Sequence, residues 1–371
     1  MVFLDPVIVL SDHLEVHEDV PLGALTSLGV GGAARFFARI RHSDDVSRVV
    51  DWAARRGLAL TVLGGGSNVV VADAGVDGLV VTLELRGQEL VGNEEAASVL
   101  VRVGAGEPWD DFVGASVRHG WAGVECLSGI PGLTGATPIQ NVGAYGQDVG
   151  ATLASVDVLE IDGLARRTLS HGECGLGYRT SRFKARDDGR FLVLAATFRL
   201  HAGGEPCLAY PEIARQFAGP ARPTLADVRA AVLATRRAKS MLLDPGDENG
   251  RSCGSFFLNP ELTRAEHDAL VARAPVAPPG YALPDGRVKV PAAWLIENAG
   301  FRRGQRFGNV GISSRHALAL VCHPGATAAQ VVDAAHRIRD GVRRVFDVSL
   351  EAEPRFFGFA TPSSQLPALA G

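Results

Sequence analysis

Features that mark whole classes of protein are scarce or missing in this chain of 371 residues. Its five cysteines are widely scattered and form no Cys-x-x-Cys pair, which argues against a zinc ribbon or a redox motif. No uncharged apolar stretch reaches transmembrane length, and the first residues lack the basic region of a signal peptide. We therefore expect a cytoplasmic protein with reduced thiols, no metal site and no membrane partner.

An excess of basic residues is also missing. Lys and Arg number 37 against 41 Asp and Glu, so the formal net charge is −4 at pH 7. Because nucleic-acid binding usually needs a positive surface, we expect no nucleic-acid partner. The hydrophobic content of 46% and the charged content of 21% are ordinary for a soluble globular protein. The length is sufficient for two or three domains.

Glycine is the abundant residue type, with 44 copies, and it clusters in three segments of the first half. Residues 63–68 hold three consecutive glycines whose N–H groups could bind a pyrophosphate, although a hairpin-like turn between two strands is the alternative. No Lys-Ser/Thr follows, which excludes a P-loop. Residues 29–34 resemble a dinucleotide fingerprint only weakly, because no convincing strand precedes them. The loop 128–150 combines small residues with side-chain donors that suit a flat polar ring, or else packs on itself.

Periodicity and capping residues predict the regular elements. Helices are expected at 43–57, 109–119, 224–238 and 327–346, and from Pro260 and Pro291 onward. Strands are expected at 60–63, 69–72, 79–83, 99–103, 155–161, 191–200, 317–321 and 347–350. Strands and helices alternate near the N-terminus, and the character of the chain changes after Lys239, which we interpret as a domain boundary.

Two short motifs offer chemical groups, and each also has a purely structural interpretation. Residues 177–184 carry three cations, among which Arg179 could clamp a carboxylate; a solvated surface turn is the alternative. Ser255 stands between a glycine and two phenylalanines, so its hydroxyl could face a ligand. Alternatively it leads into a helix that starts at Pro260 with Asn259 as the N-cap. Glu353 by itself is typical of a surface carboxylate.

Six blocks together are far more specific than any one of them. They are residues 26–32, 64–68, 130–146, 177–184, 254–260 and 350–353, and their order spans nearly the whole chain. In these blocks the chain resembles the UDP-N-acetylenolpyruvoylglucosamine reductase (MurB) family. The resemblance implies an α+β protein with the FAD-binding fold of the vanillyl-alcohol-oxidase type and a C-terminal substrate-binding domain. The implied domains are 1–84 (joined by 351–371) and 85–239 for FAD, and 240–350 for substrate.

The resemblance also implies the reaction and its cofactors. NADPH would reduce FAD, and the flavin would pass hydride to UDP-N-acetylglucosamine enolpyruvate, a step of peptidoglycan precursor synthesis. The product would be UDP-N-acetylmuramate. The partner is then a small UDP-sugar, and we expect a monomer.

The residues that match the family's motifs are assigned as the resemblance implies. Arg179 would hold the substrate carboxylate, Ser255 would deliver a proton and Glu353 would orient the surroundings of the carboxylate. Substrate contacts would come from Lys239, Asn259, Lys289 and Tyr210, the last matching a tyrosine that covers substrate in one subgroup. The residues that would bind FAD are Gly64, Gly65, Gly66, Ser67, Asn68, Pro131, Gly132, Gly135, Ala136, Gln140, Asn141, Gly143, Ala144 and Tyr145.

Departures from the family pattern affect details of substrate contact. The segment 242–251 is longer than in the enterobacterial form, and His316 stands where a polar amide is expected. Two rival functions remain: a sugar or alcohol oxidase of the same fold, and a nucleotide-sugar-binding protein without catalysis. Covalent flavin attachment, common among such oxidases, is not expected because Ser67 occupies the place of the histidine.

Overall fold

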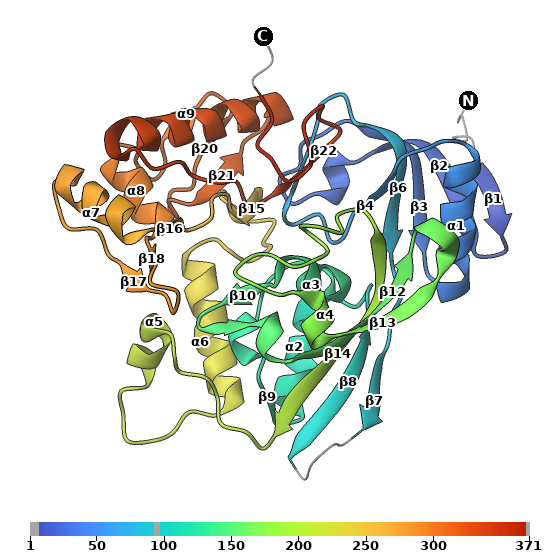
Figure 1. Cartoon of the computed structure of the whole chain (residues 1–371), viewed down its shortest axis with the longest axis horizontal. Helices are drawn as coiled ribbons and strands as arrows, with labels where there is room; N and C mark the ends of the chain where they lie inside the picture. The colour runs from blue at the N-terminus through green and yellow to red at the C-terminus, as the bar shows by residue number, and fades with distance from the viewer. Residues whose placement is uncertain (1–6, 93–96, 369–371) are drawn as a thin grey trace. The chain divides into compact units, whose positions relative to one another are not determined.

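The computed structural model describes residues 7–92 and 97–368 (Figure 1). Its contacts divide the chain into two compact units, each built from several segments. The first unit comprises Met1–Val20, Ala34–Gly65 and Asp77–Ala238, and the second comprises Pro21–Ala33, Gly66–Val76 and Lys239–Gly371. The three-domain division expected from the sequence stays a prediction.

The N-terminal part of the first unit is a five-stranded sheet with the order β1-β2-β3-β6-β4. Its strands are β1 (Val7–Ser11), β2 (Leu14–Pro21), β3 (Ala33–Ile40), β4 (Leu60–Val62) and β6 (Val76–Leu83). Helix α1 (Ser43–Arg55) buries Val46, Val49 and Val50 in the same core as the sheet. Acidic residues in its first turn and a basic residue in its last suit the helix dipole. The predicted helix is confirmed, and β4, which follows it, pairs with β6 in parallel.

A larger antiparallel sheet follows in the same unit, with the order β13-β12-β14-β8-β7 and β9 paired to β14. The strands are β7 (Gln88–Gly92), β8 (Ser98–Gly104), β9 (Trp121–Ala122), β12 (Leu153–Glu160), β13 (Arg166–Ser170) and β14 (Phe191–Ala202). Helix α2 (Trp109–Arg118) contributes Trp109 and Phe112, whose rings pack on Phe198 of β14. Helix α6 (Leu225–Ala238) is joined to α2 by two hydrogen bonds of 2.7 Å from Arg229 to Asp110.

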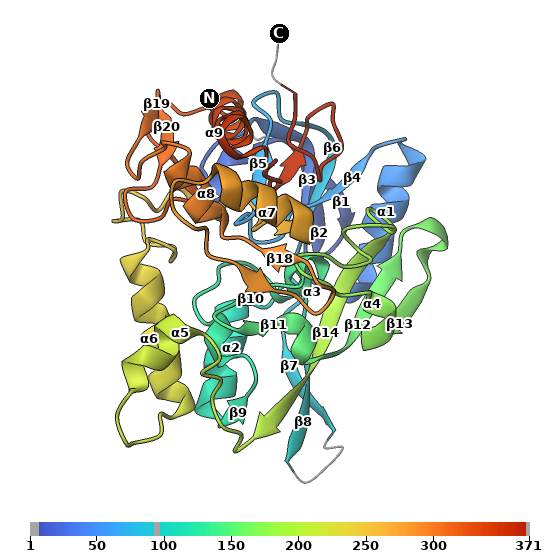
Figure 2. The ribbon, with the colours of Figure 1, turned by 60° about the vertical axis from the view of Figure 1, so that its left-hand side comes forward.

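The glycine-rich loop 128–150 is not structureless. It contains the short elements α3 (Thr137–Gln140), β10 (Gly143–Ala144) and β11 (Gln147–Asp148). Two more short helices, α4 (His171–Cys174) and α5 (Pro211–Ala214), complete the first unit. Figure 2 shows β10 and β11 as a small hairpin near β14.

The second unit has a four-stranded sheet of order β15-β21-β20-β19 and a three-stranded sheet of order β16-β18-β17. The strands are β15 (Ser252–Ser255), β16 (Glu261–Leu262), β17 (Tyr281–Ala282), β18 (Val288–Lys289), β19 (Arg306–Phe307), β20 (Val310–Ile312) and β21 (Ala319–Cys322). Helices α7 (Arg264–Arg273), α8 (Ala292–Asn298) and α9 (Ala328–Phe346) share one core with them. A parallel pair, β5 (Val69–Val71) and β22 (Arg355–Phe357), joins residues far apart in the sequence.

Three local predictions are wrong. No helix starts at Pro260: residues 261–262 form β16, and α7 begins at Arg264 with Thr263 as a cap whose hydroxyl accepts from Glu266. Residues 347–350 are not a strand, and the strand that follows α9 is β22. The segment 63–68 is not a hairpin turn, because β4 pairs with β6 whereas β5 pairs with β22.

The Rossmann interpretation of residues 29–34 is excluded, because strand β3 and not a helix follows them. The content of packed helices and largely antiparallel sheets is that of an α+β protein, as predicted. Within residues 7–92 and 97–368, none of the helices combines the length and the apolar character that crossing a bilayer requires.

Candidate active site

Arg179 occupies a strained position in a tight turn of the first unit. Gly177 and Thr180 exchange main-chain hydrogen bonds of 3.0 and 3.3 Å, so Tyr178 and Arg179 form the tip. Arg179 has φ of 53°, a conformation that residues with side chains seldom adopt and that neighbouring contacts must hold in place. The turn therefore holds this side chain in a direction that an ordinary turn would not provide.

The glycine-rich loop receives the Arg179 side chain. Its guanidinium donates from Nη1 to the carbonyl of Asn141 at 3.2 Å and from Nη2 to the carbonyl of Gly143. Asn141, itself at φ of 45°, donates from Nδ2 to the carbonyl of Gly177 at 2.9 Å and accepts from the N–H of Gly150 at 2.8 Å. The structure thus brings together two of the predicted segments, the basic turn and the loop expected to bind the flavin ring.

Two glycine segments of the first unit also lie side by side. A Cβ on Gly65 would approach the Cα of Gly132 to 2.6 Å, and a Cβ on Gly64 would lie 3.4 Å from the Cβ of Ala136. Gly135 packs equally closely, because a Cβ there would lie 2.6 Å from the Cβ of Ala105. The approaches of 2.6 Å explain why glycine is needed at positions 65 and 135, whereas a Cβ at position 64 would make an ordinary contact. Bare backbone from two loops is the surface that a pyrophosphate and a flat ring require, so these residues fit FAD.

The rest of the first glycine segment belongs to the second unit. The carbonyl of Gly66 accepts from the N–H of Ser27 at 3.0 Å, and a Cβ on Gly66 would lie 1.9 Å from the carbonyl oxygen of Leu25. The carbonyl of Asn68 accepts from the N–H of Arg355 at 3.0 Å. Ser67 lies between them, and its role in binding FAD stays a prediction.

Tyr145 and Tyr210 meet edge to face, with ring centroids 5.3 Å apart. Tyr210 is 38% exposed and directly precedes α5, a position from which a ring can cover a ligand. Burial raises the pKa of Tyr145 to about 12, although Arg236 acts in the opposite direction. Arg236 also donates to the carbonyl of Gly129 at 3.1 Å. The sequence did not single out Arg236, because a charged residue in a helix is usually solvated.

Ser255 ends strand β15 immediately after a β-bulge. Ser252 pairs with Val321 and Ser255 pairs with Ala319, so one extra residue is accommodated between them. Gly254 has φ of 77°, as expected for the glycine of such a bulge. Because bulges re-aim side chains at functional sites, the structure provides a reason for the Gly-Ser order that the sequence alone did not.

Glu353 lies beside the residues that directly follow strand β15. Its N–H donates to the carbonyl of Phe256 at 2.9 Å, and Phe257 forms an antiparallel bridge with Ala352. Phe256 and Phe257 are buried in the core of the second unit, with exposures of 0% and 2%. Ser255 and Glu353, predicted from blocks almost 100 residues apart, are therefore held on adjacent main-chain segments.

The residues predicted to contact the substrate have different structural surroundings. Asn259 accepts at Oδ1 from the N–H of Ala292 at 2.9 Å, so it caps α8 and not the helix that the sequence suggested. Lys289 on β18 forms a 3.4 Å ion pair with Glu261 on β16. Lys239 is half-buried and starts the second unit after α6.

The two segments expected to depart from the family pattern form hydrogen bonds within the second unit. Nδ1 of His316 accepts from the N–H of Leu318 at 3.1 Å. In the segment 242–251, Asn249 accepts from the N–H of Ser314 at 2.9 Å and donates to its hydroxyl at 3.1 Å.

Four of the five cysteines, Cys126, Cys174, Cys253 and Cys322, are buried thiols. All five lie in the described ranges as free thiols. Burial raises the pKa of Cys174 to about 11 and that of Cys322 to about 12, and it also raises the pKa of Cys126 and Cys253. Among residues 7–92 and 97–368, no group of three or more His, Cys, Asp or Glu side chains is placed to hold a metal ion.

Comparison with known proteins identifies the class and then the family. A family model described as "FAD binding domain" matches residues 34–168, the part that carries both adjoining glycine segments. Fold and site thus define a FAD-dependent flavoprotein. A second model, "UDP-N-acetylenolpyruvoylglucosamine reductase, C-terminal domain", matches residues 244–357. The chain belongs to the UDP-N-acetylenolpyruvoylglucosamine reductase family, as the six sequence blocks indicated.

Similar proteins from several bacteria support this assignment to the family. The UDP-N-acetylenolpyruvoylglucosamine reductase of Thermobifida fusca is 46% identical over 351 residues, which are 92% of this chain and 97% of that protein. The reductase of Salinispora arenicola is 44% identical over 92% of this chain and 96% of its own length. The crystal structure of the reductase (MurB) from Thermus caldophilus superposes with a TM-score of 0.65 at 24% identity, covering 93% of this chain and 99% of that chain. This last likeness shows that the fold is shared.

Proposed function

We propose that Arg179, Ser255 and Glu353 act on the substrate in the reaction that this chain catalyses. As a member of its family, the chain is a FAD-dependent oxidoreductase of peptidoglycan precursor synthesis. It uses NADPH to reduce UDP-N-acetylglucosamine enolpyruvate to UDP-N-acetylmuramate. The oxidase and the non-catalytic alternatives are thereby set aside.

The two adjoining glycine segments support the proposed cofactor site. Bound FAD supplies hydride chemistry, with NADPH as the source of the hydride. The residues proposed to hold it share small side chains or polar groups in the two segments: Gly64, Gly65, Gly66, Ser67, Asn68, Pro131, Gly132, Gly135, Ala136, Gln140, Asn141, Gly143, Ala144 and Tyr145. One observation favours this assignment: a Cβ on Gly65 would lie only 2.6 Å from the Cα of Gly132, so the two segments are in close contact.

The proposed binding of the substrate carboxylate rests on Arg179. Hydride addition at the vinyl carbon of an enolpyruvyl group leaves negative charge that spreads into the neighbouring carboxylate. A planar guanidinium can hold that carboxylate through two parallel N–H groups, and the attraction grows as the charge develops. The carbonyls of Asn141 and Gly143 fix the direction of the Arg179 fork before the substrate arrives, which lowers the cost of ordering it.

Ser255 is proposed to deliver the proton that completes the reduction. A serine hydroxyl is a weak acid in water, so it can act only on a strongly basic carbon or with the help of a neighbouring group. The bulge at Gly254 aims the hydroxyl, and the main chain of Glu353 lies alongside. We propose that Glu353 orients the surroundings of the substrate carboxylate.

The remaining assignments follow the same family pattern. We propose that Lys239, Asn259 and Lys289 contact the UDP-sugar, where a lysine suits the diphosphate. Tyr210 is proposed as the tyrosine that covers bound substrate, which its exposed ring beside Tyr145 supports. We also propose a cytoplasmic monomer, whose size can be measured by light scattering after gel filtration.

The two half-reactions provide the test. We predict that Ser255→Ala is reduced by NADPH within about twofold of the wild-type rate, since this step needs no proton from serine. Reoxidation by the enolpyruvyl sugar should slow by at least about a hundredfold, because the carbanionic carbon loses its proton donor. Both rates are measured anaerobically from the flavin absorbance in a stopped-flow instrument.

A matched serine serves as the control. Ser252 lies on the same strand, before the bulge, and Ser252→Ala should leave both half-reactions near the wild-type rates. Normal reoxidation of Ser255→Ala would remove Ser255 from the mechanism.

A further inference from the structure

The turn that carries Arg179 needs support from its surroundings. A positive φ costs a residue other than glycine about 1–2 kcal/mol, so the position persists only when neighbouring contacts determine it. Two contacts act next to Arg179: Lys184 donates from Nζ to its carbonyl at 3.3 Å, and Ser181 donates from its hydroxyl to the carbonyl of Ile139 at 2.6 Å. Both come from the segment just after the turn, which must itself be fixed.

Asp187 fixes that segment through its main chain and its side chain. Its N–H donates to the carbonyl of Arg182 at 2.9 Å, and its carboxylate accepts from Nε of Arg182 at 2.6 Å. The two side chains are only 13% and 8% exposed, so solvent screens this ion pair little. Arg182 is tied in turn to helix α4, because its N–H donates to the carbonyl of Cys174 at 2.9 Å and its Nη1 to that of Glu173 at 3.1 Å.

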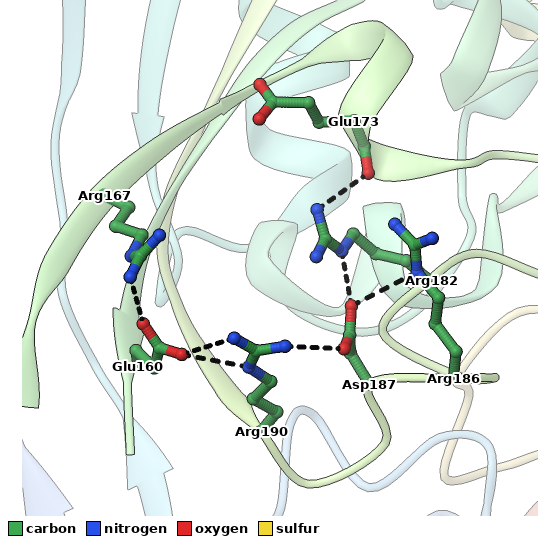
Figure 3. A network of polar contacts seen from close by, with 7 residues as sticks. All are labelled: Glu160, Arg167, Glu173, Arg182, Arg186, Asp187 and Arg190. Carbon is green, nitrogen blue, oxygen red and sulfur yellow. Dashed lines mark hydrogen bonds and ion pairs between the residues drawn. The ribbon is translucent and has the colours of Figure 1, made fainter. Parts of the chain in front are cut away.

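A chain of charges joins Asp187 to the large sheet of the same unit. Figure 3 shows the Asp187 carboxylate among the guanidiniums of Arg182, Arg186 and Arg190. Arg190, next to the start of β14, reaches Asp187 at 3.2 Å and Glu160 at the end of β12 at 2.6 Å. The segment after Arg179 is therefore anchored to two strands that pair with each other.

Aromatic packing reinforces the anchor. The guanidiniums of Arg182 and Arg190 lie 5.3 and 5.1 Å from the centroid of the Phe191 ring. Phe183, which is buried, meets the same ring edge to face at 6.2 Å. The Arg182 guanidinium also lowers the pKa of Asp187, so the carboxylate is charged at neutral pH and can hold both arginines.

We propose that Asp187 is a positioning residue for the reduction: it fixes residues 181–187 and thereby the direction of the Arg179 guanidinium. The inference rests on the proposed role of Arg179 toward the substrate carboxylate. A carboxylate without contact to substrate would then control only the half-reaction that uses the enolpyruvyl sugar. An ion pair that merely stabilises the fold would affect both half-reactions alike.

Asp187→Asn keeps the shape of the side chain and removes its charge. We expect flavin reduction by NADPH to stay within about twofold of the wild type, while reoxidation by saturating enolpyruvyl sugar slows by about tenfold. The apparent dissociation constant of that sugar should rise, because the fork no longer meets the carboxylate in a fixed direction. Asp187→Glu, which restores the charge, should recover part of the lost rate.

Asp157→Asn is the matched control. It removes a partly exposed ion pair of 2.8 Å with Arg102, between β12 and β8 of the same unit, and should leave both half-reactions unchanged. If Asp187→Asn does not fold, Arg182→Lys takes its place as the test variant. Lysine keeps the positive charge but cannot contact Asp187 and the carbonyl of Glu173 at the same time.

Arg179→Lys separates this inference from the proposed function. If Arg179→Lys reoxidises slowly while Asp187→Asn reoxidises at the wild-type rate, Asp187 has no positioning role and the function of Arg179 stands. Equal slowing of both half-reactions in Asp187→Asn, with a lower melting temperature, also overturns the inference. If Arg179→Lys reoxidises normally, the proposed role of Arg179 fails first and the inference fails with it.

Discussion

Several candidate site residues of the first unit have unusual backbone conformations. Asn141, Tyr145 and Arg179 all have positive φ, and hydrogen bonds from Arg179 and Asn141 connect the loop to the turn. Such conformations cost free energy, so their clustering in one region is evidence for a function that needs the resulting geometry. Three of the predicted site residues are thus among the residues with positive φ, and their roles stay predictions.

Tyr145 yields a prediction of pH dependence. Its pKa of about 12 in the folded chain exceeds the value of about 10 expected when unfolded, chiefly because it is buried. The folded protein thus binds this proton more tightly, and the associated stability is present below pH 10 and lost as the pH rises through 12. We expect the free energy of unfolding to fall by up to about 2–3 kcal/mol more in the wild type than in Tyr145→Phe over this range.

Urea unfolding of both proteins between pH 8 and 11 measures the first half of this difference, about 1.4 kcal/mol at pH 11. Phenylalanine has no proton to lose, so the variant reports all other titrations of the chain. Parallel pH profiles for the two proteins would contradict the assigned burial of the hydroxyl.

At the level of elements, the start of a helix is stabilised by its own first residues and also by residues far away in the sequence. Helix α9 starts at a capping box in which Thr327 accepts from the N–H of Gln330, a pattern that the sequence shows. Two further N–H groups of its first turn, from Ala328 and Ala329, are bound by Asp73 at 2.7 and 2.9 Å. A carboxylate at a helix N-terminus also interacts favourably with the helix dipole. Asp73 thereby joins α9 to the loop that follows β5.

Asp73→Ala should therefore lower the free energy of unfolding by about 1–2 kcal/mol, the usual value of a lost helix cap. Asp77→Ala is the control, since Asp77 is paired only with Arg35 on the surface and should contribute at most about 0.5 kcal/mol. Chemical denaturation of the three proteins provides the comparison. An effect of Asp73→Ala no larger than that of Asp77→Ala would show that the cap is dispensable.

At the level of the whole molecule, the family assignment predicts a flavoprotein with reversibly bound FAD. Residues 64–68 contain no histidine, so no covalent bond between this segment and the flavin is expected. We predict that the purified protein is yellow and that denaturation followed by ultrafiltration moves all of the flavin into the filtrate. Colour retained with the unfolded chain would contradict non-covalent binding, and a colourless protein unable to bind FAD would contradict the cofactor assignment.

Much of the fold could be predicted because its signals are local. The apolar spacing of Val46, Val49 and Val50 predicted α1, and the capping-box spacing of Thr224 and Asp227 predicted α6. The short strands at the N-terminus escaped notice, since pairs such as β1 and β2 are defined by their partners more than by their composition. The helix expected from Pro260 failed for a similar reason: Asn259 bonds to Ala292, 33 residues away, and not to its own neighbours.

The family, the reaction and the order of the functional blocks could be predicted from the sequence, because motifs of small and charged residues remain readable along the chain. Which segments pack against one another became known from the three-dimensional structure. It placed Gly65 against Gly132, Ser255 on a bulge and Arg179 on a turn with positive φ. The physical reason is that close backbone approach, register and strain all depend on contacts between residues far apart in sequence, which no local pattern records.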